Sequence, residues 1–241
     1  MSDEIIKLLE KLRLKGMLSA LDKTLKTADS KGHPPLWAIK TLLRAEYRQQ
    51  EERSMSNRLG QAKLPWDWTL DTFPYDRQPA VKKQNIQALA SLEFMNRQQN
   101  IVLIGSPGTG KTGIAIGLLR EAIVNGCRGR FYNAQNLIDE LYASLADRTT
   151  TKLLNRLARY DLLVIDELSY LSLKLEQSNA FFKLLDQRYG RKSTIITSNL
   201  DYDDWYQLFQ RKELVDAMLD RLQHHCITIR INGDTLRTPD S

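Results

Sequence analysis

One eight-residue segment limits what this chain can fold into more than any other feature. The segment fits G-x-x-x-x-G-K-[ST], a glycine-rich loop whose backbone N–H groups surround phosphates. Its residues are Gly105, Ser106, Pro107, Gly108, Thr109, Gly110, Lys111 and Thr112. A short apolar run over 100–104 precedes the loop, and an apolar, helix-forming run over 114–124 follows it. This order of strand, loop and helix predicts a phosphate-binding site in an α/β fold. We expect Lys111 to reach the β- and γ-phosphates and the Thr112 hydroxyl to bind Mg²⁺.

A second cluster of chemistry lies some 55 residues downstream. The apolar run 162–165 ends in the adjacent carboxylates Asp166 and Glu167. Asp166 suits Mg²⁺, directly or through water, and Glu167 suits a general base that polarises the attacking water. Two carboxylates after a strand can also cap a helix, but the phosphate loop upstream favours the catalytic interpretation.

Two asparagines also follow predicted strands. Asn199 ends the stretch 193–199, where it can hold the attacking water or the γ-phosphate. An ordinary turn-forming role for Asn199 remains open. Asn133 ends another predicted strand and is a possible hydrogen-bond partner of Glu167.

The second part of the chain alternates between strands and helices. The expected strands are 101–104, 129–133, 162–165, 194–197 and 227–231. The expected helices between them are 111–125, 135–146, 151–159, 175–190 and 213–224. Such alternation predicts a parallel sheet flanked by helices, with the ligand at the carboxyl ends of the strands.

The first 65 residues are predicted to form a small all-helical domain. Apolar spacing favours one helix over 3–30 and another over 36–63, with a break at the prolines between them. Residues 66–241 form the predicted catalytic domain. Within it, 66–80 is interpreted as a linker packed on the core, and a helix over 81–94 is expected beside the base of the nucleotide.

Positive charge is concentrated in the helical domain. Residues 1–65 carry 13 Lys and Arg against 8 Asp and Glu, whereas 66–241 carry 22 against 21. This imbalance favours a polyanionic partner. Lys40, Arg44 and Arg48 recur at four-residue spacing on one helix face, which makes them the candidate DNA-binding residues. An ordinary solvated face is the alternative.

The N-terminal residues lack the apolar core of a signal peptide, and no run approaches the roughly 18 apolar residues of a membrane span. We therefore expect a cytoplasmic protein without a membrane partner.

Four segments resemble the motifs of AAA+ ATPases. The phosphate loop, 162–167 and 193–200 resemble the nucleotide-binding, hydrolysis and sensor motifs, and 219–225 resembles the segment that carries the arginine finger. Together with 12–17 and 45–48, they resemble the IstB/DnaC branch, and most closely its IstB-like members, over nearly the whole chain.

The resemblance implies an ATP-binding, DNA-binding AAA+ ATPase core. We expect a departure from most AAA+ proteins, namely no C-terminal lid domain, because only ten residues follow Ile231. It also implies that Asn199 is the first sensor and that Arg221 is a finger reaching the γ-phosphate in a neighbouring subunit. Arg237 resembles a second sensor, and Gly113 departs from the histidine frequent in relatives, which predicts a looser first turn of its helix.

IstB-like proteins are helper subunits of bacterial insertion sequences. The resemblance therefore implies a homo-oligomer on double-stranded DNA, with ATP at subunit interfaces, that selects or remodels target DNA and recruits a transposase. Three other interpretations stay open at this point: a DnaC-like replicative helicase loader, a phosphate-loop kinase, and a nucleotide-gated DNA scaffold with negligible turnover.

Overall fold

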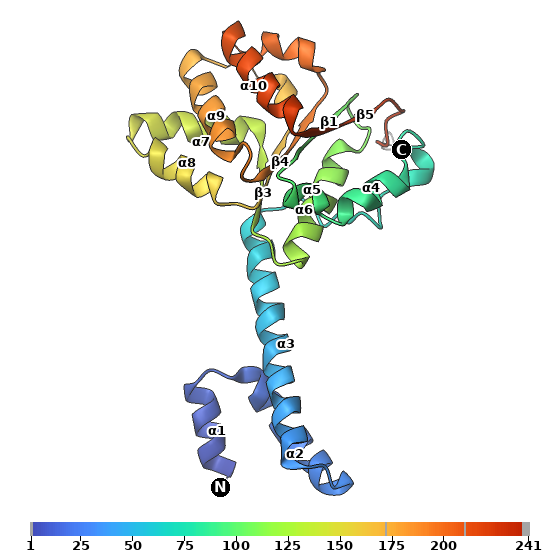
Figure 1. The fold of residues 1–241 in the computed structure, drawn as a ribbon, viewed down its shortest axis with the longest axis vertical. Coiled ribbons are helices and arrows are strands. Elements are labelled where there is room, and N and C mark those ends of the chain that lie inside the picture. Colours follow the sequence, from blue (N-terminus) through green and yellow to red (C-terminus); the bar gives the residue numbers. More distant parts are fainter. Residues whose placement is uncertain (1, 172, 210, 238–241) are drawn as a thin grey trace. The chain divides into compact units, whose positions relative to one another are not determined.

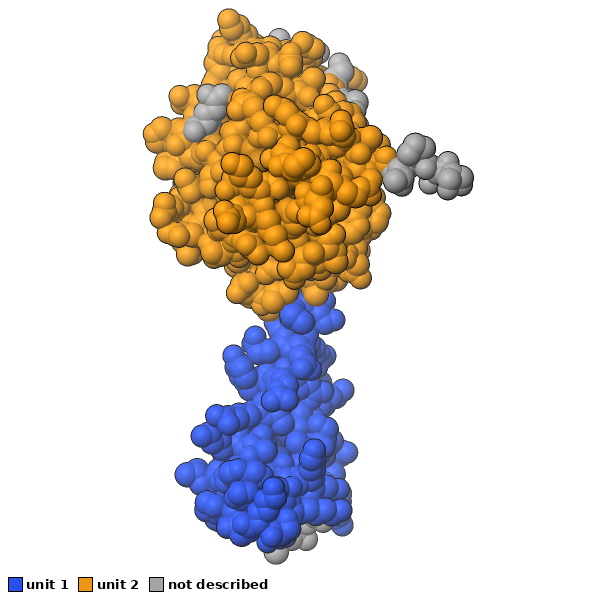
Figure 2. Space-filling view, turned by 90° about the vertical axis from the view of Figure 1, so that its right-hand side faces the viewer, with its two compact units in different colours: residues 1–57 blue, residues 58–241 orange. Residues whose placement is uncertain are grey.

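A computed structural model describes residues 2–171, 173–209 and 211–237 (Figure 1). The chain divides into two compact units, residues 1–57 and 58–241 (Figure 2). The first unit holds α1 (Ser2–Lys11), α2 (Lys15–Lys31) and most of α3 (Pro35–Ala62). One leucine from each helix builds its buried centre, namely Leu9, Leu21 and Leu42.

The predicted single helix over 3–30 is wrong, because the chain turns between α1 and α2. Arg13 in this turn has a positive φ of 59°. The turn lets Leu9 and Leu21 share one apolar core, and this burial outweighs the helical preference of the sequence. α2 and α3 pack closely at Gly16. A Cβ there would lie only 2.6 Å from the carbonyl oxygen of Ala45, so a larger side chain would not fit.

A buried carboxylate caps the start of α2. Glu46 accepts hydrogen bonds from the N–H groups of Gly16 (2.7 Å) and Met17 (3.1 Å). These amides belong to the first turn of a helix, which leaves its N–H groups without intrahelical partners. Burial raises the pKa of Glu46, but the bonds from Met17, Gln50 and Gly16 together hold it below its usual range. The segments 12–17 and 45–48, which carry part of the family resemblance, therefore meet at one structural contact.

The outer face of α3 is both apolar and basic. Its exposed apolar residues are Leu36, Ile39, Leu43 and Tyr47. The candidate DNA-binding residues Lys40, Arg44 and Arg48 are also exposed on this helix. The side chains that α3 buries in its own unit are instead Ala38, Leu42 and Glu46.

A five-stranded sheet forms the centre of the second unit. Its strands are β1 (Asn100–Gly105), β2 (Gly129–Asn133), β3 (Leu162–Asp166), β4 (Ser193–Ser198) and β5 (Cys226–Ile231). Their order is β2-β3-β4-β1-β5, and every pairing is parallel. The predicted parallel α/β sheet is confirmed, with all five strands within one residue of their expected bounds.

Alternate side chains along each strand point to opposite faces of the sheet. In β1, Ile101 and Leu103 belong to one core cluster, whereas Val102 and Ile104 belong to the other. The first face is covered by α4 (Lys83–Ala90) and α6 (Lys111–Val124). The second is covered by α7 (Ala134–Ala146), α8 (Thr150–Ala158), α9 (Leu175–Arg188) and α10 (Lys212–His224). Two buried faces explain why β1 over 101–104 and β3 over 162–165 are continuous apolar runs.

The helix predicted over 81–94 is divided in the structure. It consists of α4 and the short α5 (Glu93–Asn96), separated at Leu92, whose φ is 62°. This break lets Leu92 and Phe94 both enter the core beneath the sheet. Upstream, Leu70 and Phe73 pack into the same core, so the segment 66–80 is attached to this unit.

No helix follows β5 within the part of the chain that the structure describes. None of the described helices has both the length and the apolarity that crossing a membrane requires.

Candidate active site

The phosphate loop connects β1 to α6 and folds around an open centre. Gly108 and Gly110 have φ values of 83° and 94°, a region that favours glycine. The Lys111 ammonium donates to the carbonyl oxygens of Gly105 (2.6 Å) and Ser106 (2.8 Å), so it lies against the loop. Burial lowers the pKa of Lys111, against the opposing influence of the nearby carboxylates of Asp166 and Glu167.

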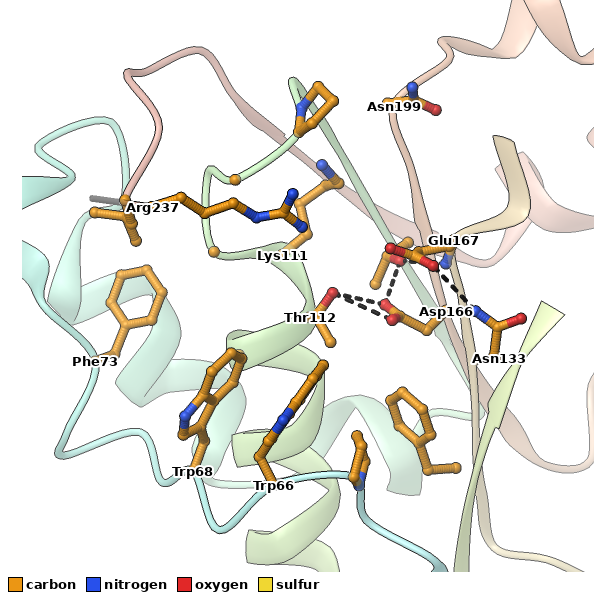
Figure 3. A pocket seen from close by; sticks show the side chains of 18 of the residues that line it. Trp66, Trp68, Phe73, Lys111, Thr112, Asn133, Asp166, Glu167, Asn199 and Arg237 are labelled. Carbon is orange, nitrogen blue, oxygen red and sulfur yellow. Dashed lines mark hydrogen bonds between the residues drawn. The ribbon is translucent and has the colours of Figure 1, made fainter. Parts of the chain in front are cut away.

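Thr112 and Asp166 meet across the start of α6 and the end of β3. The Thr112 hydroxyl lies 2.9 and 3.2 Å from the two carboxylate oxygens of Asp166 (Figure 3). Burial raises the pKa of Asp166, while hydrogen bonds from Thr197 and Thr112 oppose that rise. A hydroxyl and a carboxylate are hard oxygen donors, and this paired set fits Mg²⁺.

Thr197 is a site residue for which the sequence analysis gave no role. It is fully buried on β4, donates to Asp166 Oδ1 at 2.6 Å and accepts the N–H of Glu167 at 2.9 Å. One hydroxyl therefore fixes both the aspartate side chain and the glutamate backbone. The available signal was its place near the carboxyl end of a strand that pairs with the strand of Asp166.

Glu167 is held in an unusual conformation beside the loop. Its φ is 61°, and its Oε2 accepts a hydrogen bond from Asn133 Nδ2 at 3.0 Å. The side-chain oxygen Oδ1 of Asn133 has a separate partner: it accepts the Gln135 N–H at 3.0 Å and caps α7. Asn133 thus lies at the position expected from the sequence, and its amide keeps the Glu167 carboxylate on the β2 side.

These groups line one pocket of about 590 Å³. Its wall includes Pro107, Gly108, Gly110, Lys111, Thr112, Asn133, Asp166, Glu167 and Asn199. This volume falls within the range of about 300–1,000 Å³ typical of small-molecule sites. The structure therefore brings the predicted phosphate, metal, water and first-sensor residues to a single cavity.

The segment after β5 crosses the phosphate loop. The Leu236 N–H donates to the Gly108 carbonyl oxygen at 2.8 Å, and Gln78 Nε2 donates to the Asp234 carbonyl oxygen at 3.0 Å. Arg237 consequently lines the pocket beside Lys111 (Figure 3) and contributes to lowering the lysine pKa.

The segment 66–80 also contributes to the pocket, beyond its expected role as a linker. Trp66, Trp68 and Phe73 line the cavity together with the phosphate loop (Figure 3). The looser first turn expected at Gly113 stays a prediction; the structure places the Trp68 ring against that glycine.

Arg221 does not reach this pocket in its own chain. It lies near the end of α10, pairs with Asp186 at 3.1 Å, and stacks over the Phe182 ring at 5.2 Å. The small hollow beside it is lined by Asn100 and Thr194, which stand at the amino ends of β1 and β4. The phosphate loop follows the carboxyl end of β1, so the small hollow and the phosphate loop lie at opposite ends of the strands.

Comparison with known proteins decides the family. The family model described as "IstB-like ATP binding protein" matches residues 7–241. This chain belongs to the IstB-like ATP-binding protein family.

Two relatives of this IstB-like protein come from insertion sequences. A protein named as ATP-binding in insertion sequence IS21 of Pseudomonas aeruginosa is 37% identical over 81% of this chain and 74% of its own length. The corresponding protein of IS232 from Bacillus thuringiensis subsp. berliner is 31% identical over 96% of this chain and 93% of its own.

Solved structures place the IstB-like fold among AAA+ proteins. The crystal structure of the DnaC helicase loader is 26% identical, with a TM-score of 0.54 over 70% of this chain and 99% of that one. AMPPCP-bound DnaA from Aquifex aeolicus shares the fold at 22% identity, with a TM-score of 0.58 over 70% of this chain and 51% of DnaA.

Proposed function

We propose that this IstB-like protein hydrolyses ATP, assembles as a homo-oligomer on duplex DNA, and assists a transposase during insertion-sequence transposition. The insertion-sequence relatives support the last part. The replication initiator DnaA, which shares the fold, has been solved bound to AMPPCP and single-stranded DNA. One observation carries the proposal: a single pocket is lined by the residues predicted to bind phosphate and metal and to activate water, whereas Arg221 lies at the opposite ends of the strands.

Each group in the pocket has a distinct role in this account. Lys111 and the loop amides bind the phosphates, and Thr112 with Asp166 would hold Mg²⁺. Glu167 takes the proton of the attacking water, and Asn199 orients that water or the γ-phosphate. Mg²⁺, when bound, neutralises charge on the phosphate oxygens.

The place of Arg221 supports a site completed between subunits. An arginine finger stabilises the charge that develops on the transferred phosphoryl group. In this account, the Arg221 of one subunit supplies that charge to the pocket of its neighbour. ATP would then couple assembly to DNA contact.

The test is ATP hydrolysis measured with and without duplex DNA, on wild-type protein and on Lys111→Ala. We expect hydrolysis by the wild type, a higher rate with DNA, and loss of nucleotide binding in the variant. The variant should keep its fold by circular dichroism. A correctly folded Lys111→Ala protein with normal nucleotide affinity would contradict the phosphate-loop assignment.

A DnaC-like helicase loader is the second candidate, favoured by the structural likeness to the DnaC loader. Both candidates share the ATPase core, so hydrolysis does not separate them. Co-purification does: a transposase partner supports the first function, and a replicative helicase partner supports the second.

A further inference from the structure

Two tryptophans at the pocket wall are unusually exposed. Trp66 and Trp68 stack on each other with ring centroids 4.8 Å apart and planes 22° from parallel. They remain 51% and 44% exposed, whereas Trp205 is fully buried in the core. Because an indole is largely apolar, an open stacked pair beside a cavity indicates a binding surface.

The backbone that carries the two indoles is fixed to the helix of the phosphate loop. Arg120 of α6 donates to the Trp68 carbonyl oxygen at 3.2 Å and pairs with the Asp67 carboxylate. Thr69 and Thr72 also bond to each other and close the turn that follows. The indoles are therefore held in position before any ligand arrives, which reduces the entropy cost of binding.

Space for the pair depends on a missing side chain in α6. A Cβ at Gly113 would lie 3.2 Å from the Trp68 ring, and Gly113 directly follows Lys111 and Thr112. A larger side chain at this position would compete with the indole for the same space. The Trp68 ring thus lies against the residue that follows Thr112 and stands two positions after Lys111.

The other aromatic side chains of the pocket offer less surface. Phe73 and Phe131 are only 8% and 9% exposed because they pack into the core. A base attached to phosphates in the loop must lie close to that loop, and the accessible aromatic surface there belongs mainly to the two indoles (Figure 3). Stacking of this kind tolerates different bases, because every base has a π-face.

We propose that Trp66 and Trp68 form a stacking shelf for the base of the nucleotide whose phosphates occupy the loop. This inference rests on the proposed nucleotide-binding function and deepens it. The shelf binds purines more strongly than pyrimidines because their stacking surface is larger. It contributes affinity without direct contact to the hydrolytic groups.

The test compares two ligands that share phosphates but differ in the base. Calorimetry in Mg²⁺ buffer measures the affinity of full-length protein for ATP and for inorganic tripolyphosphate. The variants are Trp66→Leu, Trp68→Leu and Trp68→Phe. Trp37→Leu is the control, because that indole stacks on His33 in the other unit.

The leucine variant of the indole that the base contacts should bind ATP roughly 5- to 150-fold more weakly, from the usual worth of one base–aromatic stack. Because the two indoles stack on each other, the other leucine variant should lose less. Tripolyphosphate affinity should stay within about twofold, since it has no base to stack. Trp68→Phe should recover part of the loss, and the control should match the wild type. The wild-type preference for ATP over UTP should narrow in the leucine variants.

Two results would overturn the shelf. Unchanged ATP affinity in both leucine variants would show that the indoles face another partner, such as a second subunit or DNA. Equal weakening of ATP and tripolyphosphate would show that they only shape the phosphate loop. Neither result removes the proposed function, which fails separately if wild-type protein binds ATP no better than Lys111→Ala.

Discussion

The hydroxyl of Thr197 lies 2.6 Å from Oδ1 of Asp166, inside the sheet and away from solvent. This contact joins β4, which Asn199 follows, to β3, which ends at Asp166 and is followed by Glu167. The same hydroxyl accepts the Glu167 N–H, so it restrains the positive φ at which Glu167 presents its side chain. We infer that Thr197 is a positioning residue for hydrolysis.

Thr197→Val tests this role while keeping the shape of the side chain. A hydrogen bond to a charged group is worth about 1.5–3 kcal/mol. If this energy holds the carboxylates in place for hydrolysis, its loss raises the barrier and slows the rate on the order of 10- to 100-fold. We expect hydrolysis to fall by that amount with ATP affinity nearly unchanged, and Thr197→Ser to restore it. Steady-state rates and ATP titrations provide the measurement. A Thr197→Val variant that hydrolyses ATP at the wild-type rate would show that Thr197 does not position the hydrolytic groups.

Arg221→Ala should keep ATP binding but lose hydrolysis and assembly. The Arg221–Asp186 pair is partly exposed, and such pairs add little stability, so the variant should fold. Asp186→Asn is the matched control, because it breaks the same pair and keeps the guanidinium. That control should retain hydrolysis.

Mixing Arg221→Ala with Lys111→Ala protein tests whether the finger acts between subunits. Each variant supplies its intact half to one mixed interface, so some hydrolysis should return. An Arg221→Ala protein that hydrolyses ATP normally by itself would place the finger elsewhere, at Arg191 or Arg211.

DNA binding should weaken steeply with salt and depend little on sequence. Exposed Lys40, Arg44 and Arg48 motivate this prediction, because phosphate contacts release counterions. Neutralising all three should reduce the slope of log affinity against log salt by up to about 2.7. Fluorescence anisotropy with labelled duplex measures the slope.

The control for this measurement neutralises three exposed lysines of α2, namely Lys23, Lys26 and Lys31. If the control and the test variant change the slope equally, net charge rather than the α3 face determines binding. If neither changes it, the DNA surface lies on the second unit, where the next candidates are Arg148, Lys152, Arg156 and Arg159.

Glu46→Gln should destabilise the helical unit at neutral pH. The native pKa of Glu46 is lowered, so its carboxylate stabilises the fold above the unfolded-state pKa of about 4.3 and loses that effect as pH falls through the native value. The difference in unfolding free energy between wild type and Glu46→Gln should therefore disappear in acid. Denaturant unfolding at neutral and acidic pH measures it, with exposed Glu51→Gln as control. A difference in unfolding free energy that persists in acid would show that the negative charge of Glu46 does not stabilise the helical unit.

The sheet and the phosphate loop were predictable because their sequence signals are local. A parallel sheet buried on both faces requires continuous apolar strands, and the phosphate loop requires its glycines and lysine at fixed spacing. The Asp166–Glu167 pair could be placed for the same reason, since it directly follows a buried strand. Expected strand bounds within one residue of the observed ones reflect this strong local pattern.

Features that depend on distant contacts were not predictable. The breaks at Arg13 and Leu92 arise from packing partners that the helical periodicity does not reveal. Arg188 looks like a surface residue, yet it is buried and donates to carbonyl oxygens of Leu157, Tyr160 and Ser193. Burial lowers its pKa to about 9, so it stays charged at neutral pH.

The most direct test of the account uses Glu167→Gln, which keeps the size of the side chain but removes the carboxylate base. Asp166 remains to serve Mg²⁺, so ATP should still bind. Loss of a general base commonly lowers the rate by about 10²- to 10⁴-fold. If ATP binding drives assembly and hydrolysis drives release, the variant should accumulate on duplex DNA.

The measurement follows ATP hydrolysis and, in the same samples, dissociation from labelled duplex after excess competitor DNA is added. The account predicts slow hydrolysis together with slow dissociation, relative to wild type. Slow hydrolysis with wild-type dissociation would show that turnover does not set the lifetime of the DNA complex. Hydrolysis at the wild-type rate would contradict the catalytic role of Glu167 itself.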